Sequence, residues 1–263
     1  MNRTTGRLAI AASIVLGASL LGGWTVQQQV QAAPPDHAQK NATVQVFLTR
    51  HGKTVLNTLD RVQGWSDSPL TAPGRAVAEV VGENLGEREG RMDAAYSADM
   101  VRHYETASLM LDAMGSKLEP VRLEGLREIN FGAFEGAENG EMWSEILEHL
   151  GVSTIEEALD GRSMTDLVGV IKEIDPDPAL PAEDCGDVNA RMMDSLNEIA
   201  ADAAKHRDDQ VLVVSSGLSI MCVLDALGSE LPPTGIANGA VNLLEYKAGR
   251  WSVKSVNDTS YAG

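Results

Sequence analysis

Two short apolar runs, each ending in a polar turn that contains glycine, constrain the fold of this chain most. Val44 to Leu48 leads into Arg50-His51-Gly52, and Gln210 to Val214 leads into Ser215-Ser216-Gly217. Runs of this kind are typical of strands that are buried on both faces of a parallel sheet. Because ligands of such sheets bind beyond the carboxyl ends of the strands, we expect both turns to lie in one site.

The residues between these runs have helical periodicity, so the chain is predicted to alternate strands and helices. Apolar spacing indicates helices from Thr71, over about 100–114 and from Asp187, with short extended segments between them. A terminal hairpin is expected over 241–256, divided by Ala248-Gly249. This order predicts an α/β fold, a three-layer sandwich with a mostly parallel central sheet flanked by helices.

Residues 135–184 interrupt this alternation. They are acidic and contain several glycines and three prolines, which predicts short helices and loops. We interpret them as an insertion that forms a lid, within one domain that spans residues 43–258.

The first 32 residues are predicted to be a signal peptide. Arg3 and Arg7 form a basic start, Leu8 to Trp24 is apolar, and Val30-Gln31-Ala32 ends in the small residues that signal peptidase recognises. The alternative is an uncleaved N-terminal anchor, although the apolar run is short for a spanning helix. After cleavage, residues 33–42 would be a flexible lead-in to a secreted or extracytoplasmic protein without stable membrane association.

Charge and cysteine content exclude several classes of partner. The net charge is −17, and removing Arg3 and Arg7, the only charged residues among the first 32, leaves −19. Such a surface repels nucleic acid and anionic membranes.

Cys185 and Cys222 are too few for a disulfide framework, so they are either buried thiols or one bridge. The sequence has no metal-ligand spacing, P-loop or dinucleotide-binding glycine pattern, so no metal and no cofactor are expected.

Three segments, in order along the chain, carry a family resemblance. They are Leu48 to Thr54 (LTRHGKT) with Gln63 to Thr71 (QGWSDSPLT), Ser97 to Ala107 (SADMVRHYETA), and Leu126 to Gly136 (LREINFGAFEG). Together they resemble the histidine phosphatase superfamily, in its phosphoglycerate-mutase-like branch, over roughly residues 44–256. The third segment looks more like the phosphatase members than the mutase members.

The resemblance implies a role for each matching residue. His51 would be the nucleophile that forms a phosphohistidine, and Glu128 would be the general acid. A neutral imidazole is a good nucleophile near neutral pH, and the planar fork of arginine suits a phosphoryl group. The residues implied to bind the phosphoryl group or the substrate are Arg50, Asn57, Arg102 and Gln63.

One residue of the family pattern is missing. The family has a second histidine, in a Ser-His-Gly setting after the last parallel strand, where this chain has Ser216. We expect the neutral hydroxyl of Ser216 to contact phosphate, with turnover weakened on the order of 10²–10³-fold by the loss of a charged donor. His103 directly follows Arg102 and could substitute. Because adjacent helical residues point about 100° apart, we expect His103 to lie outside the site.

The predicted function is hydrolysis of small phosphate monoesters by transfer to His51 and then to water. Glu124 and Glu135 are rivals of Glu128 for the role of acid. The alternative function is a non-catalytic phospholigand-binding or scaffold protein. A phosphodiesterase or phosphotransferase that uses the same histidine is a third possibility.

Overall fold

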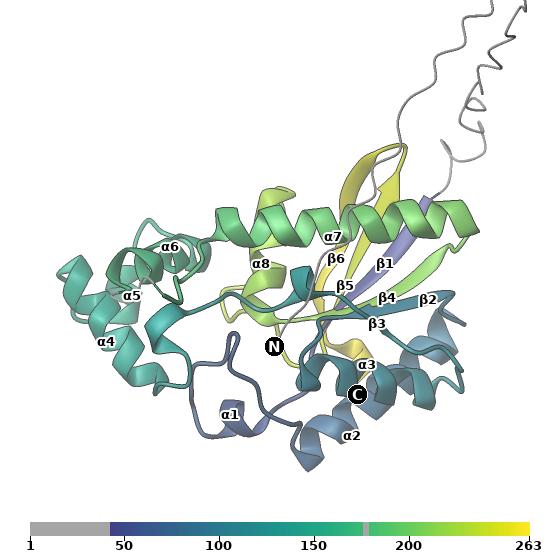
Figure 1. Cartoon of the computed structure of the whole chain (residues 1–263), viewed down its shortest axis with the longest axis horizontal. Helices are drawn as coiled ribbons and strands as arrows, with labels where there is room; N and C mark the ends of the chain where they lie inside the picture. Colours follow the sequence, from purple (N-terminus) through teal and green to yellow (C-terminus); the bar gives the residue numbers. More distant parts are fainter. Residues whose placement is uncertain (1–42, 176–178) are drawn as a thin grey trace, which may run out of the picture. The chain divides into compact units, whose positions relative to one another are not determined.

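Strand β1 (Thr43–Arg50) ends at the predicted site and lies in the interior of a single sheet. The structure, a computed structural model, describes residues 43–175 and 179–263, so the predicted signal peptide (1–32) and lead-in (33–42) lie outside the described residues. The described strands have the order β3-β2-β4-β1-β5-β6 (Figure 1). The other strands are β2 (Ala94–Ser97), β3 (Val121–Arg122), β4 (Gln210–Ser215), β5 (Val241–Lys247) and β6 (Arg250–Asp258).

The strand register brings the two predicted turns to one edge of the sheet. β1 runs parallel to β4, and Arg50 aligns with Ser215. β2 runs parallel to both β3 and β4, whereas β5 is antiparallel to β1 and forms a hairpin with β6. The residues that follow β1 and β4, His51 and Ser216, therefore leave the sheet side by side, as the sequence predicted.

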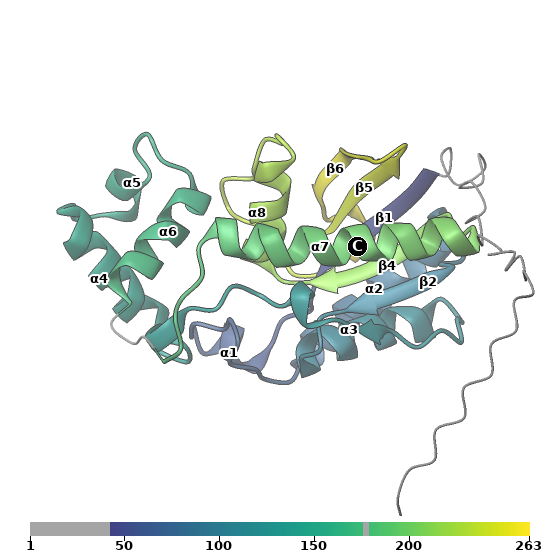
Figure 2. The ribbon, with the colours of Figure 1, turned by 45° about the horizontal axis from the view of Figure 1, so that its top comes forward.

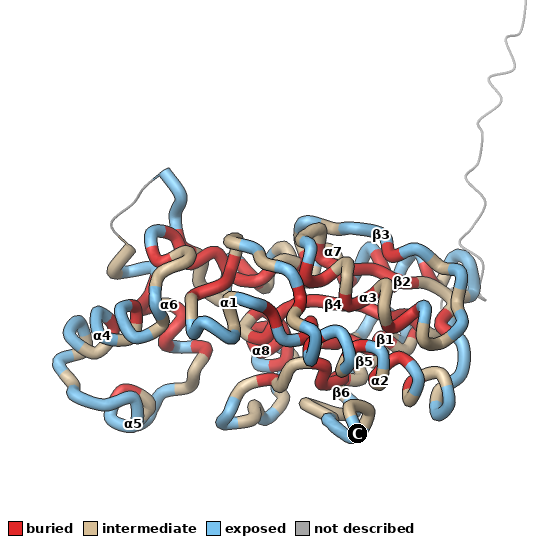
Figure 3. The backbone as a smooth tube through the Cα atoms, turned by 90° about the horizontal axis from the view of Figure 1, so that it is seen from below, coloured by how far each residue is buried: buried red, intermediate tan, exposed pale blue. Residues whose placement is uncertain are grey.

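Alternate residues of β1 face two different helical layers. Val46 and Leu48 pack in a core cluster with α7 (Cys185–His206) and α8 (Gly217–Ala226), whereas Phe47 packs with α2 (Ala72–Arg88) and α3 (Val101–Ala113). Figure 2 shows α7 along one face of the sheet and α3 on the other. Figure 3 shows that much of β1 and β4 is buried. The predicted three-layer α/β sandwich is confirmed.

Capping residues explain where two of these helices begin. Thr71 is the N-cap of α2, as predicted, and its side chain accepts a hydrogen bond from the Gly74 N–H. Asp184 forms a capping box with Asp187 at the start of α7. Each cap satisfies backbone donors that the helix leaves unpaired, and such a cap stabilises a helix by about 1 kcal/mol.

Short helices occupy the described part of residues 135–184. α4 (Asn139–Leu150) and α5 (Ile155–Ala158) precede α6 (Met164–Ile174), which packs against α7 and α8. Their assignment as a lid stays a prediction. The remaining short elements are α1 (Val55–Thr58) and the 3₁₀ turns η2 (Glu124–Leu126), η3 (Gly132–Phe134) and η4 (Ser260–Ala262).

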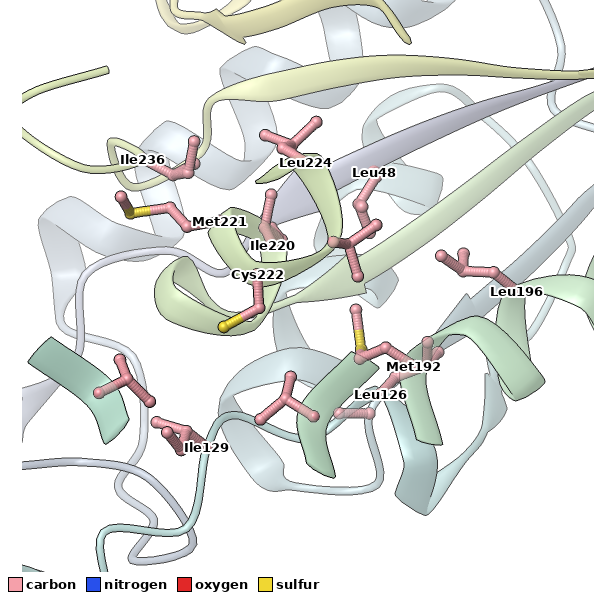
Figure 4. Close-up of a cluster of buried hydrophobic side chains, with 14 of the residues drawn as sticks. Leu48, Leu126, Ile129, Met192, Leu196, Ile220, Met221, Cys222, Leu224 and Ile236 are labelled. Carbon is pink, nitrogen blue, oxygen red and sulfur yellow. The ribbon is translucent and has the colours of Figure 1, made fainter. Parts of the chain in front are cut away.

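A disulfide links the first residue of α7 to the middle of α8. Cys185 and Cys222 are bonded, with their Cα atoms 5.3 Å apart, so the alternative of two buried thiols is wrong. The two helices pack together, and Figure 4 shows Cys222 in the same cluster as Met192 and Ile220. Within residues 43–175 and 179–263, no helix has the length and apolar character needed to cross a membrane.

Candidate active site

Backbone and ring hydrogen bonds fix His51 at the carboxyl end of β1. Its N–H donates to the Ser215 carbonyl at 3.0 Å, and its carbonyl accepts from Asn238 Nδ2 at 2.9 Å. Its ring Nδ1 lies 2.8 Å from the Gly52 carbonyl oxygen. Because a carbonyl can only accept, Nδ1 carries the proton, and the lone pair of the neutral ring lies on Nε2. Nε2 makes no hydrogen bond to any residue that the structure describes.

The surroundings of His51 keep its ring uncharged. Only 2% of the residue is exposed. Burial, together with the guanidinium groups of Arg102 and Arg50, holds the pKa of His51 well below its ordinary value. The Nε2 lone pair is therefore available near neutral pH, which is the condition that a histidine nucleophile must meet.

Arg50 supplies a positive charge beside His51. One of its terminal nitrogens, Nη1, donates to the Ile236 carbonyl, and its Nε is buried without a partner among the described residues. A Cβ atom at Gly217 would lie 3.2 Å from this Nε, so glycine leaves room for the guanidinium. An unpaired buried donor of this kind is costly unless a ligand accepts from it.

Arg102 supplies a second positive charge and is completely buried. Its Nη1 donates to the Ser66 carbonyl at 3.0 Å and to Asp67 Oδ1 at 2.9 Å, and its Nη2 donates to the Gly64 carbonyl at 2.7 Å. Its Nε, like that of Arg50, has no partner within the described part of the chain. The loop from Gly64 to Asp67 therefore sets the orientation of this guanidinium.

Glu135 holds that loop in place. Its carboxylate accepts from four backbone N–H groups, those of Gly64, Trp65, Ser66 and Phe131, at 2.7 to 3.2 Å. Such charge-assisted bonds order a loop strongly. Glu135, a predicted rival for the acid, is thus committed to the loop. The other rival, Glu124, pairs with Arg127 and is exposed.

Glu128 is the carboxylate that reaches the site. Its Oε1 accepts from the Ile129 and Ser219 N–H groups at 3.0 and 2.8 Å, and its Oε2 accepts from the Leu218 N–H at 3.1 Å. Two of these donors belong to the first turn of α8. Since each carboxylate oxygen has two lone pairs, Oε2 keeps one that can hold a proton.

Gln63 and Asn57 present amide groups to the same region. The Oε1 atom of Gln63 accepts from the Thr54 and Ser68 hydroxyls at 2.9 and 2.7 Å, which leaves its Nε2 buried without a partner among the described residues. The Oδ1 atom of Asn57 accepts from the Thr54 N–H in the capping box of α1. The oxygen of each amide is therefore engaged, and the amino group is the part left to contact a ligand.

The expectation that His103 lies outside the site was wrong. His103 is completely buried in the first turn of α3, and its Nε2 lies 2.6 Å from the hydroxyl oxygen of Ser216. Its ring also packs edge-on against the ring of His51, with the centroids 5.2 Å apart. Arg102 and His103 do leave the helix about 100° apart, but both side chains are buried. One sign of this placement was present in the sequence, a histidine that directly follows Arg102 in the second family segment.

A pocket of about 210 Å³ collects most of the predicted residues. Its polar lining includes Arg50, Asn57, Gln63 and Glu128, with Arg61 and Asn139 at the same opening, and its apolar lining includes Phe131, Met221 and Ile236. A larger hollow of about 530 Å³ near Tyr96 and Asp202 contains none of these predicted residues. The other predicted residues, His51, Arg102 and Ser216, do not line this pocket, but Arg50 and Gly217, which adjoin His51 and Ser216 in the chain, do. Within the described ranges, no cluster of His, Cys, Asp and Glu could hold a metal ion.

Comparisons with known proteins agree with this geometry. The family described as the histidine phosphatase superfamily, branch 1, matches residues 46–259. A probable phosphoglycerate mutase of Yersinia enterocolitica is 30% identical over 83% of this chain and 94% of its own. A metal-independent phosphoserine phosphatase of Arabidopsis thaliana is 28% identical over 84% of each. The crystal structure of a phosphoglycerate mutase from Bacillus anthracis is 36% identical with a TM-score of 0.78, covering 85% of this chain and 97% of its own.

Proposed function

Because the chain belongs to branch 1 of the histidine phosphatase superfamily, we propose that it hydrolyses small phosphate monoesters through a phosphohistidine on His51. One observation carries this proposal. The unprotonated Nε2 of His51 lies with two arginines whose Nε atoms are buried and unpaired among the described residues. A phosphoryl group would satisfy both donors and neutralise both charges while it meets the nucleophile.

The first step transfers the phosphoryl group to His51. The Nε2 lone pair attacks phosphorus in line with the leaving oxygen, a P–N bond forms, and the P–O bond breaks. Arg50 and Arg102 neutralise the charge on the phosphoryl oxygens. Glu128, protonated on Oε2, gives its proton to the leaving alkoxide, which departs as an alcohol.

The second step returns His51 to its starting state. Glu128, now a carboxylate, takes a proton from a water molecule as that water attacks phosphorus. The P–N bond breaks, the electron pair returns to Nε2, and inorganic phosphate leaves. The proton stays on Nδ1 throughout, where it is donated to the Gly52 carbonyl, so the ring needs no tautomer change between the two steps.

Hydrolysis is favoured here over mutase activity. The named relatives include both a probable mutase and a phosphatase, so the family alone does not choose between them. The segment Glu128 to Gly136 resembles the phosphatase members. An exported protein would also rarely meet phosphoglycerate.

Hydrolysis of 4-nitrophenyl phosphate by the purified protein, by His51→Ala and by His149→Ala tests the proposal. His149 is an exposed histidine on α4, so its replacement is the matched control. We expect turnover in the wild type and the control and none above background in His51→Ala. A radiolabelled phosphoryl group should be trapped on the wild type in an acid-labile, alkali-stable form. Phosphate binding without turnover in the wild type would instead support the non-catalytic alternative.

We also propose that the protein is exported after cleavage behind Ala32. The basic start and apolar run support this, and the Cys185–Cys222 bridge fits an oxidising compartment. N-terminal sequencing of the protein from an exporting host should begin at Ala33. An intact N-terminus on a membrane-bound product would support the anchor instead.

A further inference from the structure

Ser216 and His103 form a buried hydrogen-bonded pair beside His51. Neither residue is exposed, and His103 Nε2 lies 2.6 Å from Ser216 Oγ. The two residues are 113 positions apart in sequence. They meet because α3 follows β2, α8 follows β4, and these two strands are paired in parallel.

Hydrogen-bond accounting assigns the direction of this bond. The Nδ1 of His103 is buried and has no partner among the described residues. If Nδ1 carried the proton, that N–H would be a buried donor without an acceptor, which is the less favourable arrangement. With the proton on Nε2, His103 donates to Ser216 Oγ, and the hydroxyl hydrogen of Ser216 remains free to donate elsewhere.

The neighbours of Ser216 are the groups proposed to meet the phosphoryl group. Ser216 is the N-cap of α8, but its side chain makes no cap hydrogen bond. The residue before it accepts the His51 N–H, and the residue after it, Gly217, lies against the guanidinium of Arg50. The hydroxyl is therefore held between the candidate nucleophile and a phosphate-binding arginine.

We propose that His103 is a positioning residue that orients the Ser216 hydroxyl as a donor to the transferring phosphoryl group. The inference rests on the proposed phosphatase function. The pair then fills, from α3, the place where the family pattern has a second histidine after the last parallel strand. Ser216 touches the phosphoryl oxygen, and His103 acts through Ser216. Burial, with the charges of Arg102 and Arg127, holds the pKa of His103 well below its usual range, so the ring is a neutral donor.

Two variants of similar size separate positioning from packing. His103→Gln keeps an N–H donor close to the place of Nε2, whereas His103→Leu fills the space without one. For 4-nitrophenyl phosphate we expect kcat to fall about 10- to 100-fold in His103→Leu and less than about 5-fold in His103→Gln, because a preorganised donor acts mainly in the transition state. KM should change less than about 3-fold in both. Melting temperatures verify that both variants fold.

Coupling to Ser216 is the second test. Ser216→Ala should lower kcat as much as His103→Leu does, and the double variant should lose at most about 2-fold more, since the two residues act through one hydrogen bond. Equal kcat in the wild type and Ser216→Ala would overturn the proposal. So would additive losses in the double variant. The exposed His149→Leu serves as the control for replacing a histidine.

Moving the histidine from residue 103 to residue 216 gives a third, independent test. His103 lies 2.6 Å from Ser216 Oγ, so a larger side chain at residue 216 has no space while His103 is present. Ser216→His alone should therefore lose activity, and adding His103→Ala should restore kcat to at least the wild-type value. A rise in kcat from Ser216→His alone would contradict the proposed pair.

Failure of the phosphatase function would be recognised separately. If the wild type has no turnover, the proposed function falls, and orthovanadate binding then decides the pair. Weaker binding by about 10-fold in His103→Leu but not in His103→Gln would support positioning. Equal Kd values in all three proteins would overturn it. If the wild type turns over and both His103 variants match it, only the inference about the pair fails.

Discussion

Acidification from about pH 7.5 to about pH 5.5 should destabilise this protein through two buried histidines. Burial and the neighbouring arginines hold the pKa values of His51 and His103 well below 6.5, so the folded protein keeps both rings neutral in this range. The unfolded chain binds a proton on each ring near pH 6.5. The stabilisation is therefore complete above pH 6.5 and is lost as the pH falls below it.

The linkage relation gives the size of the effect. For a group with an unfolded pKa near 6.5 that stays neutral when folded, the free energy of unfolding falls by about 1.4 kcal/mol over these two pH units. Two such histidines lower it by about 2.7 kcal/mol. Because the carboxylates titrate mostly below this range, the drop between these pH values reports mainly on histidine.

Urea unfolding at both pH values measures this drop in the wild type, in His103→Gln and in the surface control His149→Gln. The comparison is between pH values within each protein, so the intrinsic stability of each variant cancels. His103→Gln should show a drop smaller by about 1.4 kcal/mol than the wild type. Equal drops in the two proteins would refute the reasoning, because they would mean that the folded protein also protonates His103.

Three further changes have defined outcomes. Cys185→Ser with Cys222→Ser opens a loop closed across 37 residues and should lower the free energy of urea unfolding by about 4 kcal/mol, whereas an unchanged midpoint would contradict this. Glu135→Gln removes the carboxylate that accepts from four backbone N–H groups, and should lower the free energy of urea unfolding by at least about 2 kcal/mol. It should also lower kcat. Full activity would exclude a role for Glu135 in positioning the loop. Glu128→Gln should slow an alkyl phosphate by about 10²-fold or more and 4-nitrophenyl phosphate far less, and equal losses for both esters would exclude it as the acid.

Local signals predicted most of the fold. The apolar run from Val44 to Leu48 can be satisfied only by burial on both sides, so its assignment as an inner strand was secure. Thr71 before Pro73 predicted a helix start, because the hydroxyl caps the helix and proline suits its first turn. The parallel arrangement of β1 and β4 then placed His51 beside Ser216 without further information.

The details of the site depended on contacts that sequence spacing does not encode. His103 was expected outside the site because adjacent helical residues such as Arg102 and His103 point about 100° apart. Here the first turn of α3 is enclosed by the loop that holds Arg102 on one side and by Ser216 on the other. The assignment of Glu135 to the loop likewise depends on donors about 70 residues away in the chain. A carboxylate in the same sequence segment as Glu128 gives no local sign that it binds this loop.

The hydrogen bond between residues 103 and 216 has a consequence for how sequences of this family are sorted into enzymes and inactive homologues. On the resemblance described above, a motif search that reads residue 216 alone would find serine where it expects histidine, and would place this chain with the inactive homologues. The two side chains are in contact although they are far apart in the chain, because the helices that carry them follow two paired strands. Under the proposed pairing, residues 103 and 216 would have to be scored together, and a rule that reads both positions would separate a relocated histidine from a lost one.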